Sequence, residues 1–107
     1  MKNALTMLRE ARAYLTNPLH WTKHALGRDV EGKPANDWSD VVSCCAIGAL
    51  DMVERGAAIT SGAYQALVGA LPPGCREVSL FNDRPETTHD DVLELFDRAI
   101  ASAEKRA

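Results

Sequence analysis

Apolar residues recur at steps of three and four over the first fifteen positions of the chain. Leu5, Leu8, Ala11 and Leu15 fall on one stripe, which is the pattern of an amphipathic helix. Asn17-Pro18 ends this helix, because a residue before proline is disfavoured in the helical conformation. The pattern therefore predicts a first helix over residues 2–15.

The next segment, residues 18–36, lacks a clear period and leaves two alternatives. It could form a short helix that Asn17 caps, with Pro18 at its first position and Gly27 just past its end. It could also form a β-hairpin over about residues 24–36, with a type I turn at Asp29–Gly32. We favour the hairpin. On either alternative, Trp21 and Trp38 flank the segment and are expected to pin it to the core.

The stretch from Val41 to Arg55 is the least polar part of the chain and predicts a second helix that ends at Gly56. Its apolar residues cover most of the helix circumference, which is typical of a helix that is buried on several sides. We expect Asp37, Ser39 or Asp40 to cap it. This helix is predicted to be the central element.

Three further segments follow the central helix. Thr60 or Ser61 opens a third helix, which Pro72-Pro73-Gly74 terminates. Residues 75–86 show weak alternation at Val78 and Leu80, followed by a turn at Asn82-Asp83. Thr88 and Asp91 form a capping box for a last amphipathic helix that runs to the C-terminal residues.

The predicted fold is mainly α. We expect a compact four-helix domain around a buried central helix, with a small β-hairpin between helices 1 and 2. A chain of 107 residues is long enough for one core, so residues 1–107 are predicted to form a single domain.

Charge and hydropathy exclude several classes of partner. The net charge is −3 and the 12 Lys and Arg residues are scattered, whereas a nucleic-acid backbone requires a basic cluster. No window approaches the roughly 18 apolar residues of a membrane span, and charges at Arg9, Glu10 and Arg12 argue against a secretory signal. We therefore expect a cytoplasmic protein whose three cysteines are reduced.

Cys44 and Cys45 are the first candidates for chemistry. On a helix, neighbouring side chains point about 100° apart, which argues against a disulfide between them and against both ligating one metal ion. No established zinc spacing links the cysteines to His20, His24 or His89, so we expect no metal and no cofactor. Free cysteine is commonly buried, and core packing is the favoured interpretation.

Gly48 and the pair Asn82-Asp83 are the other candidates. Glycine in mid-helix costs about 1 kcal/mol relative to alanine, so Gly48 predicts a close approach by another backbone, an aromatic ring such as Trp21, Trp38 or Phe96, or a ligand. Asn82-Asp83 is predicted to be a structural turn, or else a carboxylate at the mouth of a pocket with His24 or His89 as its proton-transfer partner. If there is a binding site, we expect it to comprise the following residues: Trp21, His24, Cys45, Gly48, Asn82 and Asp83.

Several short motifs occur in a recognisable order. These are Trp21-Thr22-Lys23, Arg28–Pro34, Cys45–Leu50, Phe81-Asn82-Asp83 and the Thr87-Thr88 cap before the last helix. The order resembles a family of small bacterial and phage proteins known only as a domain of unknown function. The family pattern is a tryptophan, an R-D-x-x-G turn, a C-x-x-G-A-L helix, a W-N-D motif and a closing amphipathic helix. Phe81 stands here where the family has tryptophan, and the spacing makes Cys45 the equivalent cysteine. The resemblance implies one compact domain and no activity.

The favoured function is therefore a non-enzymatic binding module whose partner is a protein or a small molecule. The alternative is a small enzyme that uses Cys44 or Cys45 with a histidine, or Asp83 with His24 or His89. We assign no catalytic residue, because a four-helix domain of this size rarely supplies a deep cleft. A homodimer is expected if the helix over residues 60–71 leaves an apolar stripe exposed.

Overall fold

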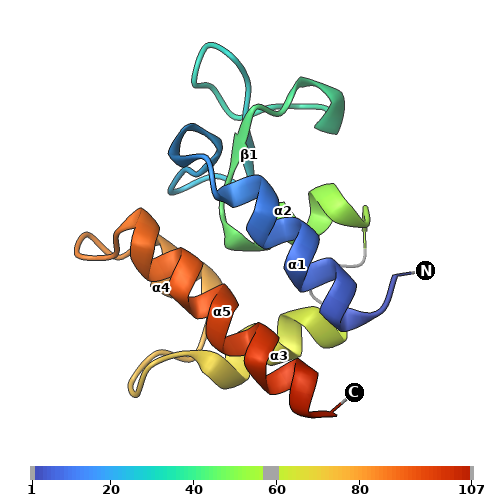
Figure 1. The fold of residues 1–107 in the computed structure, drawn as a ribbon. Helices are drawn as coiled ribbons and strands as arrows, with labels where there is room; N and C mark the ends of the chain where they lie inside the picture. Colours follow the sequence, from blue (N-terminus) through green and yellow to red (C-terminus); the bar gives the residue numbers. More distant parts are fainter. Residues whose placement is uncertain (1, 57–60, 107) are drawn as a thin grey trace.

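Five α-helices and a two-stranded sheet make up the described part of this computed structural model, which covers residues 2–56 and 61–106 (Figure 1). The α-helices are α1 (Ala4–Leu15), α2 (Ala46–Val53), α3 (Gly62–Ala70), α4 (Val78–Asp83) and α5 (His89–Arg106). Between α1 and α2 lie the 3₁₀ helices η1 (Pro18–His20) and η2 (Trp38–Asp40) and the strands β1 (Gly27–Arg28) and β2 (Ser43–Cys44). The predicted fold class, mainly α with a small antiparallel sheet between the first two helices, is confirmed.

The hydrophobic core lies between α1, α2, α3 and α5. Helix α1 contacts α2, α3 and α5, and α5 also packs along α3. The largest fully buried side chains are Phe96, Met7, Leu8, Leu15, Leu50, Leu67 and Leu95. Burial of each such side chain contributes about 1.5–3 kcal/mol, so these contacts hold the helices together. Most of the predicted apolar stripe of the first helix is part of this core, since Leu8, Ala11 and Leu15 are all inaccessible to solvent.

The helix starts follow capping chemistry. Asn3 Oδ1 accepts a hydrogen bond from Thr6 N–H at 2.8 Å, and Ser61 Oγ accepts one from Tyr64 N–H at 3.1 Å. Thr88 and Asp91 each accept a hydrogen bond from the backbone of the other, at 3.2 and 2.9 Å. The predicted capping box before the last helix is therefore confirmed. Of the two candidates for the start of the third helix, Ser61 is the cap, and Thr60 lies outside the described residues.

The predicted helix over residues 41–55 is wrong in its first turn. Ser43 and Cys44 form β2, and the helix begins only at Ala46, with Cys45 as its N-cap. Asp37, one of the expected caps, instead caps η2. A continuous apolar run does not distinguish a buried strand from a buried helix. Here the pairing of Cys44 with Gly27 on β1 decides in favour of the strand.

The predicted weak strand and turn over residues 75–86 are also wrong. Residues Val78–Asp83 form helix α4. Its buried positions are Val78, Phe81 and Asn82, which follow the i, i+3, i+4 spacing of a helix. Leu80 is 60% exposed, so the alternation that suggested a strand does not correspond to burial. Asn82 and Asp83 therefore lie in the last turn of a helix.

Both alternatives for residues 18–36 are present in part. Asn17 caps a single 3₁₀ turn that starts at Pro18. The predicted turn at Asp29–Gly32 is also formed, with a 2.9 Å hydrogen bond from Gly32 N–H to Asp29 O and a positive φ of 83° at Gly32. Within the hairpin, a single antiparallel bridge joins Arg28 to Pro34. The other side of β1 pairs with β2.

We call residues 16–45 the α1–α2 loop. In Figure 1 it extends from one end of the helical layer as the blue-to-green part of the chain. Apart from two-residue strands and single 3₁₀ turns, it has no regular structure of its own. Its conformation must therefore be held by side chains.

Candidate functional site

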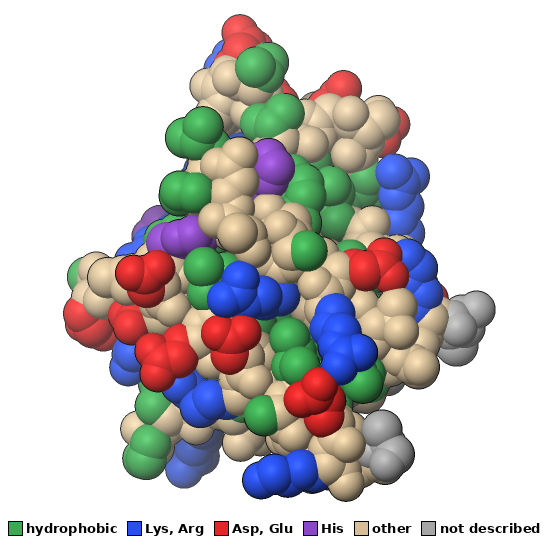
Figure 2. Space-filling model, viewed as in Figure 1, with side chains coloured by type: hydrophobic (Ala, Val, Ile, Leu, Met, Phe, Trp, Pro, Cys, Tyr) green, Lys and Arg blue, Asp and Glu red, His purple; other side chains and the backbone are tan. Residues whose placement is uncertain are grey.

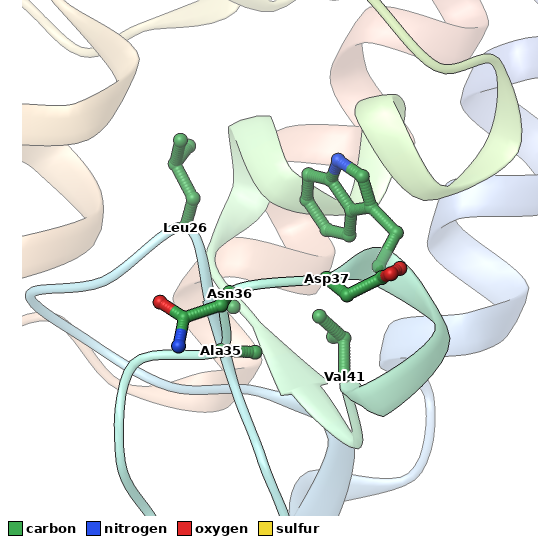
Figure 3. A pocket seen from close by; sticks show the side chains of 7 residues that line it. Leu26, Ala35, Asn36, Asp37 and Val41 are labelled. Carbon is green, nitrogen blue, oxygen red and sulfur yellow. The ribbon is translucent and has the colours of Figure 1, made fainter.

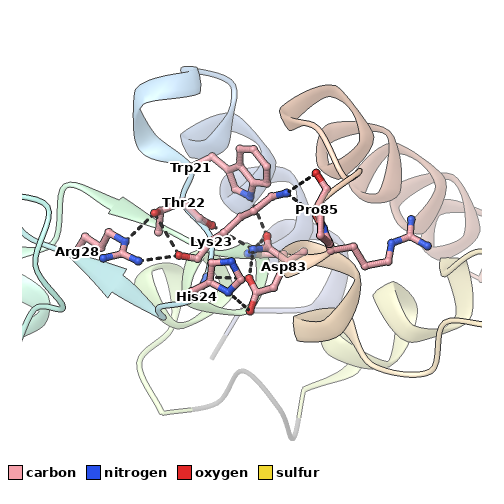
Figure 4. A network of polar contacts seen from close by, with 10 residues as sticks. Trp21, Thr22, Lys23, His24, Arg28, Asp83 and Pro85 are labelled. Carbon is pink, nitrogen blue, oxygen red and sulfur yellow. Dashed lines mark hydrogen bonds and ion pairs between the residues drawn. The ribbon is translucent and has the colours of Figure 1, made fainter.

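Four consecutive residues at the start of the α1–α2 loop bind the C-terminal end of α4 (Figure 4). Trp21 and Thr22 are linked to Asn82, Lys23 to the carbonyls after the helix, and His24 to Asp83. We call this set of contacts the α4 anchor. It brings together four of the six residues expected at a site, namely Trp21, His24, Asn82 and Asp83.

Asn82 is the centre of the α4 anchor. Its side chain is 1% exposed, and its Oδ1 accepts hydrogen bonds from Trp21 Nε1 at 2.8 Å and Ala46 N at 3.1 Å. Its Nδ2 donates to Thr22 O at 3.1 Å and to Asp83 Oδ1 at 2.9 Å. All four hydrogen bonds of the amide are thus made within the protein, so Asn82 joins α4, the loop and the start of α2.

The exposed edge of the α4 anchor carries three ionisable side chains. Lys23 Nζ donates to the carbonyls of Arg84 and Pro85, at the end of α4 where a cation is favoured by the helix dipole. Asp83 Oδ1 accepts a 2.9 Å bond from His24 N–H, and His24 Nδ1 lies 3.8 Å from Asp83 Oδ2. The side chain of His24 is 69% exposed, so this pair faces solvent.

Arg28 holds the inner part of the α1–α2 loop. Its guanidinium donates to Thr22 Oγ1 at 2.8 Å and to the carbonyls of Lys23 and Gly32 at 2.9 Å each. One side chain therefore ties the start of the loop to the turn at its outer end. These three partners occupy most of the donor capacity of the guanidinium.

Cys45 and Gly48 lie next to the α4 anchor, at the first turn of α2. Cys45 Sγ accepts a hydrogen bond from Gly48 N–H at 3.3 Å. A methyl group at position 48 would overlap the backbone carbonyl of Leu26 and come within 3.0 Å of Cys44 Cβ. Of the expected neighbours of Gly48, the one found is a backbone, so this small-residue face is filled by the α1–α2 loop.

Cys44 and Cys45 are packed in the core, as favoured from the sequence, although Cys44 does not lie on a helix as the argument against a disulfide assumed. Cys44 lies in β2 and is fully buried, and Cys45 is 5% exposed. Burial raises the pKa of the Cys44 thiol to about 12 and also raises that of Cys45. Because the thiolate is the nucleophile, both positions are poorly suited to nucleophilic catalysis. Cys75 is the third free thiol, and its Sγ accepts a 3.3 Å bond from Arg84 Nη1.

The other two histidines serve the C-terminal end of α1. His20 Nδ1 lies 2.8 Å from Tyr14 O, and His89 Nε2 lies 2.6 Å from Leu15 O. The His20 ring also stacks on Tyr14 at 4.3 Å between centroids. Each ring nitrogen must carry a proton to donate to these carbonyls, so His89, expected as a partner of Asp83, has a structural role elsewhere.

Exposed apolar side chains are concentrated on the α1–α2 loop. Of the five large hydrophobic side chains exposed in the described part of the chain, four belong to it, and these are Leu19, Leu26, Val30 and Val42. Figure 2 shows hydrophobic side chains, together with some Asp and Glu, on the upper part of the molecule, while most of the charged side chains lie over the helices below.

A shallow pocket opens beside β1, and we call it the Trp38 pocket (Figure 3). It has a volume of about 170 Å³ and is lined by Leu26, Gly27, Ala35, Asn36, Asp37, Trp38 and Val41. The backbone comes close here because Gly27 has no side chain: a methyl group would lie 2.8 Å from Val41 Cγ2. The carboxylate of Asp37 lies at the η2 side of the pocket, where it accepts a 2.9 Å bond from Ser39 N–H.

A second hollow, of about 360 Å³, lies between the start of α1, the start of α3 and the end of α5. Its walls are mainly small side chains, such as Ala4, Ala66 and Ala103. The apolar side chains of α3 are buried or partly buried against the core. A homodimer was expected if this helix left an apolar stripe exposed. Such a stripe is not found on residues 62–70.

Within residues 2–56 and 61–106, no three His, Cys, Asp or Glu side chains gather closely enough to hold a metal ion. Helices long and apolar enough to cross a membrane are likewise missing from the part of the chain that the structure describes.

Thr22, Lys23 and Arg28 were not singled out from the sequence, although all three belong to the quoted motifs. A single basic residue in a polar loop does not form a recognisable motif. The partners of Lys23 and Arg28 include backbone carbonyls, which any residue could supply, so the sequence does not reveal them. One signal was available. Both the R-D-x-x-G turn and the aromatic-N-D motif were part of the family resemblance, and the structure joins them through Thr22, which bonds to Arg28 and to Asn82.

Comparison with known proteins gives a family and no activity. No curated protein matches the chain, and no solved structure matches it either. The model of a family of unknown function, DUF6197, matches residues 1–102, so the chain belongs to this family, as the order of its motifs indicated.

Proposed function

We propose that this protein is a non-enzymatic protein-binding module and that the exposed apolar surface of the α1–α2 loop is its binding face. The observation that carries the proposal is that four of the five large apolar side chains exposed in the described residues belong to this loop. Apolar side chains gathered on one surface are typical of interaction sites, whereas scattered ones need no explanation. The loop is also long for a connection within a small domain, and long loops of this kind commonly carry function.

The size of the Trp38 pocket favours a protein over a small molecule. Its volume of about 170 Å³ is below the ~300 Å³ at which clefts for small ligands usually begin. Such a pocket is large enough for one side chain of a partner. Leu26 and Trp38, on its rim and wall, would supply the apolar contact area around that side chain.

The α1–α2 loop is held in place before any partner binds. Asn82 and Arg28 together make seven hydrogen bonds, six of which involve the loop or the start of α2. A surface that is already ordered loses little conformational entropy on binding. This supports a preformed binding face, and the free thiols at Cys44, Cys45 and Cys75 are consistent with action in the reducing cytoplasm.

The test is to compare capture of partner proteins by the wild-type chain, by Leu26→Asp and by Leu80→Asp. The two leucines are similarly exposed, at 53% and 60%, but Leu80 lies on α4, outside the loop. We expect Leu26→Asp to lose the partner that the wild-type chain and Leu80→Asp retain. Equal capture by Leu26→Asp, with an unchanged circular dichroism spectrum, would refute the proposed face.

His24 supports a second candidate function, proton transfer with Asp83. It is the one non-glycine residue with a positive φ in the described ranges, at 66°, and such strain in an exposed residue is often found at functional sites. Its Nδ1 is 3.8 Å from Asp83 Oδ2, a distance that a small side-chain rotation would close. The alternative reading is that the backbone bond from His24 N–H to Asp83 alone requires this conformation.

Replacement of His24 by glycine separates these two readings. Glycine adopts a positive φ without strain, so His24→Gly keeps the backbone bond and removes the imidazole. If the residue is only structural, the variant should be at least as stable as the wild-type chain, with unchanged partner capture. If the wild-type chain shows a hydrolytic or transfer activity that His24→Gly lacks, the protein is an enzyme and the binding-module proposal is wrong.

A further inference from the structure

We propose that the Trp38 pocket receives one apolar side chain from a positively charged segment of the partner protein. This inference rests on the proposed binding face and adds the chemistry of its occupant. The apolar part follows from the pocket itself, in which Leu26, Trp38 and Val41 surround the close backbone approach at Gly27.

The charge of the partner follows from the acidic residues of the chain segment that forms one side of the pocket, of which Asp37 lines the pocket itself. Residues 29–40 carry four carboxylates, on Asp29, Glu31, Asp37 and Asp40, and a single ammonium group, on Lys33. None of the four forms an ion pair with a described residue. This stretch therefore has an uncompensated charge of −3, by counting four acids against one base.

The neighbouring cations do not neutralise this charge. Arg28 points its guanidinium inward, to Thr22 and to backbone carbonyls. Arg55 lies close enough to contribute to lowering the pKa of Asp37, but the main cause is the hydrogen bond from Ser39 N–H. Asp37 thus stays ionised and exposed at the edge of the pocket.

Several acidic residues elsewhere on the surface form ion pairs with cations of the chain. Along the seam of α1 and α5, Asp97 pairs with Arg12 at 2.9 Å and Glu104 pairs with Arg9 at 2.6 Å. Several surface carboxylates of the helices are thus matched by the protein's own cations, whereas the four in residues 29–40 have no such partner among the described residues. Opposite charge across an interface guides association and selects the partner.

Two other occupants are disfavoured by the same charge. A second copy would bring an equally acidic loop against this one, since both copies carry −3 over residues 29–40. A nucleic acid would be repelled for the same reason. A basic protein segment with an apolar side chain at its centre satisfies both the pocket and its rim.

The experiment is a titration of the ¹⁵N-labelled protein with three short synthetic peptides, followed by NMR. The first peptide has a central leucine flanked by lysines, the second has the same leucine flanked by glutamates, and the third has alanine in place of leucine in the lysine sequence. The indole N–H of Trp38 reports on the pocket. The indole N–H of Trp21, which is bonded to Asn82, is the internal control.

We expect the lysine–leucine peptide to shift the Trp38 indole and the Gly27 amide while the Trp21 indole stays in place. The glutamate peptide should bind roughly tenfold more weakly or not at all. Added salt should weaken binding of the lysine peptide. The alanine peptide should also bind more weakly, since it leaves the pocket empty.

Charge variants supply a second measurement. Asp37→Asn with Asp40→Asn removes two charges near the pocket, and asparagine remains a good cap for η2. The matched control, Glu77→Gln with Asp90→Asn, removes the same net charge from exposed positions at the N-cap of α4 and in the first turn of α5. Only the first pair of substitutions should weaken binding of the lysine peptide, and the Kd should rise severalfold.

Three results would overturn the inference. The first is equal binding of the lysine and glutamate peptides. The second is equal binding of the lysine peptide by the two pairs of charge variants. The third is a shift of the Trp38 indole with protein concentration alone, which would make a second copy the occupant. If partner capture depends on Leu26 while the charge variants behave as the wild-type chain, the inference fails and the proposed function stands. If capture does not depend on Leu26, the proposed function itself fails.

Discussion

The backbone carbonyl of Leu26 occupies the space that a side chain at position 48 would need. A methyl group built on Gly48 would overlap this oxygen and would lie 3.0 Å from the carbonyl carbon. Leu26 O also accepts a 3.3 Å hydrogen bond from Cys45 N–H. The glycine therefore allows the α1–α2 loop to lie directly on the first turn of α2, and the cost of glycine in a helix is offset by this contact.

Gly48→Ala is predicted to lower the free energy of unfolding by at least about 2 kcal/mol, because neither backbone can move aside cheaply. Gly69→Ala is the matched control, since Gly69 is also helical and no atom lies within 4 Å of its missing side chain. That variant should gain about 0.5–1 kcal/mol. Urea unfolding of both proteins checks the prediction, and equal changes would contradict it.

Asn82→Ala is predicted to destabilise the protein by about 2–4 kcal/mol. The change leaves the Trp21 indole N–H and the Ala46 N–H without their acceptor, and each unsatisfied buried group costs about 1–3 kcal/mol. Asn36→Ala, on the exposed part of the loop, should change stability by less than about 0.5 kcal/mol. Thermal unfolding measures both, and a near-neutral Asn82→Ala would show that the α4 anchor is not cooperative.

The three thiols are predicted to differ in reactivity. At pH 8, iodoacetamide should label Cys75, which is partly exposed, while Cys44 and Cys45 stay unlabelled until denaturant is added. Burial keeps these two thiols protonated and out of reach. Mass spectrometry of the intact protein counts the labels, and Cys75→Ser should take up none. Rapid labelling of Cys45 in the native wild-type chain would reopen the thiol-enzyme alternative.

Stability is predicted to fall at alkaline pH partly because of Cys44. Its pKa is raised by burial from an ordinary 9.0 to about 12, so between these values the unfolded chain releases a proton that the folded chain retains. Unfolding is therefore favoured as pH rises, by up to about 1.4 kcal/mol per pH unit. Cys45 and Tyr14, whose pKa values are also raised, act in the same direction. Urea unfolding from pH 8 to 11 should show a shallower decline for Cys44→Ala than for the wild-type chain, and identical slopes would contradict the assignment.

Helices with a clear local signal were predicted correctly. The stripe of Leu8, Ala11 and Leu15 and the capping box of Thr88 and Asp91 both depend on residues within one or two helical turns. The turn at Asp29–Gly32 is local in the same sense. Periodicity and capping are properties of neighbours in the chain, so they can be read without knowledge of the fold.

The errors fall where a distant partner decides the structure. Cys44 belongs to a strand because Gly27 and Trp21 lie on either side of it, and nothing in the run Val41–Leu50 contains that information. Helix α4 is six residues long, which is too short for a period to emerge clearly. The gathering of Trp21, His24, Asn82 and Asp83 was expected, but their contacts span about 60 positions of sequence.

The sequence by itself determined the helical class, the family, the burial of Cys44 and Cys45 and the need for a close neighbour at Gly48. Only the tertiary structure decided that this neighbour is the backbone of Leu26 and that Asn82 is fully bonded inside the protein. It also decided that Leu26 and Asp37, eleven positions apart in the sequence, line the same pocket. The physical reason is that hydrogen bonds and close contacts between distant segments depend on how the chain is folded back on itself, whereas local periodicity does not.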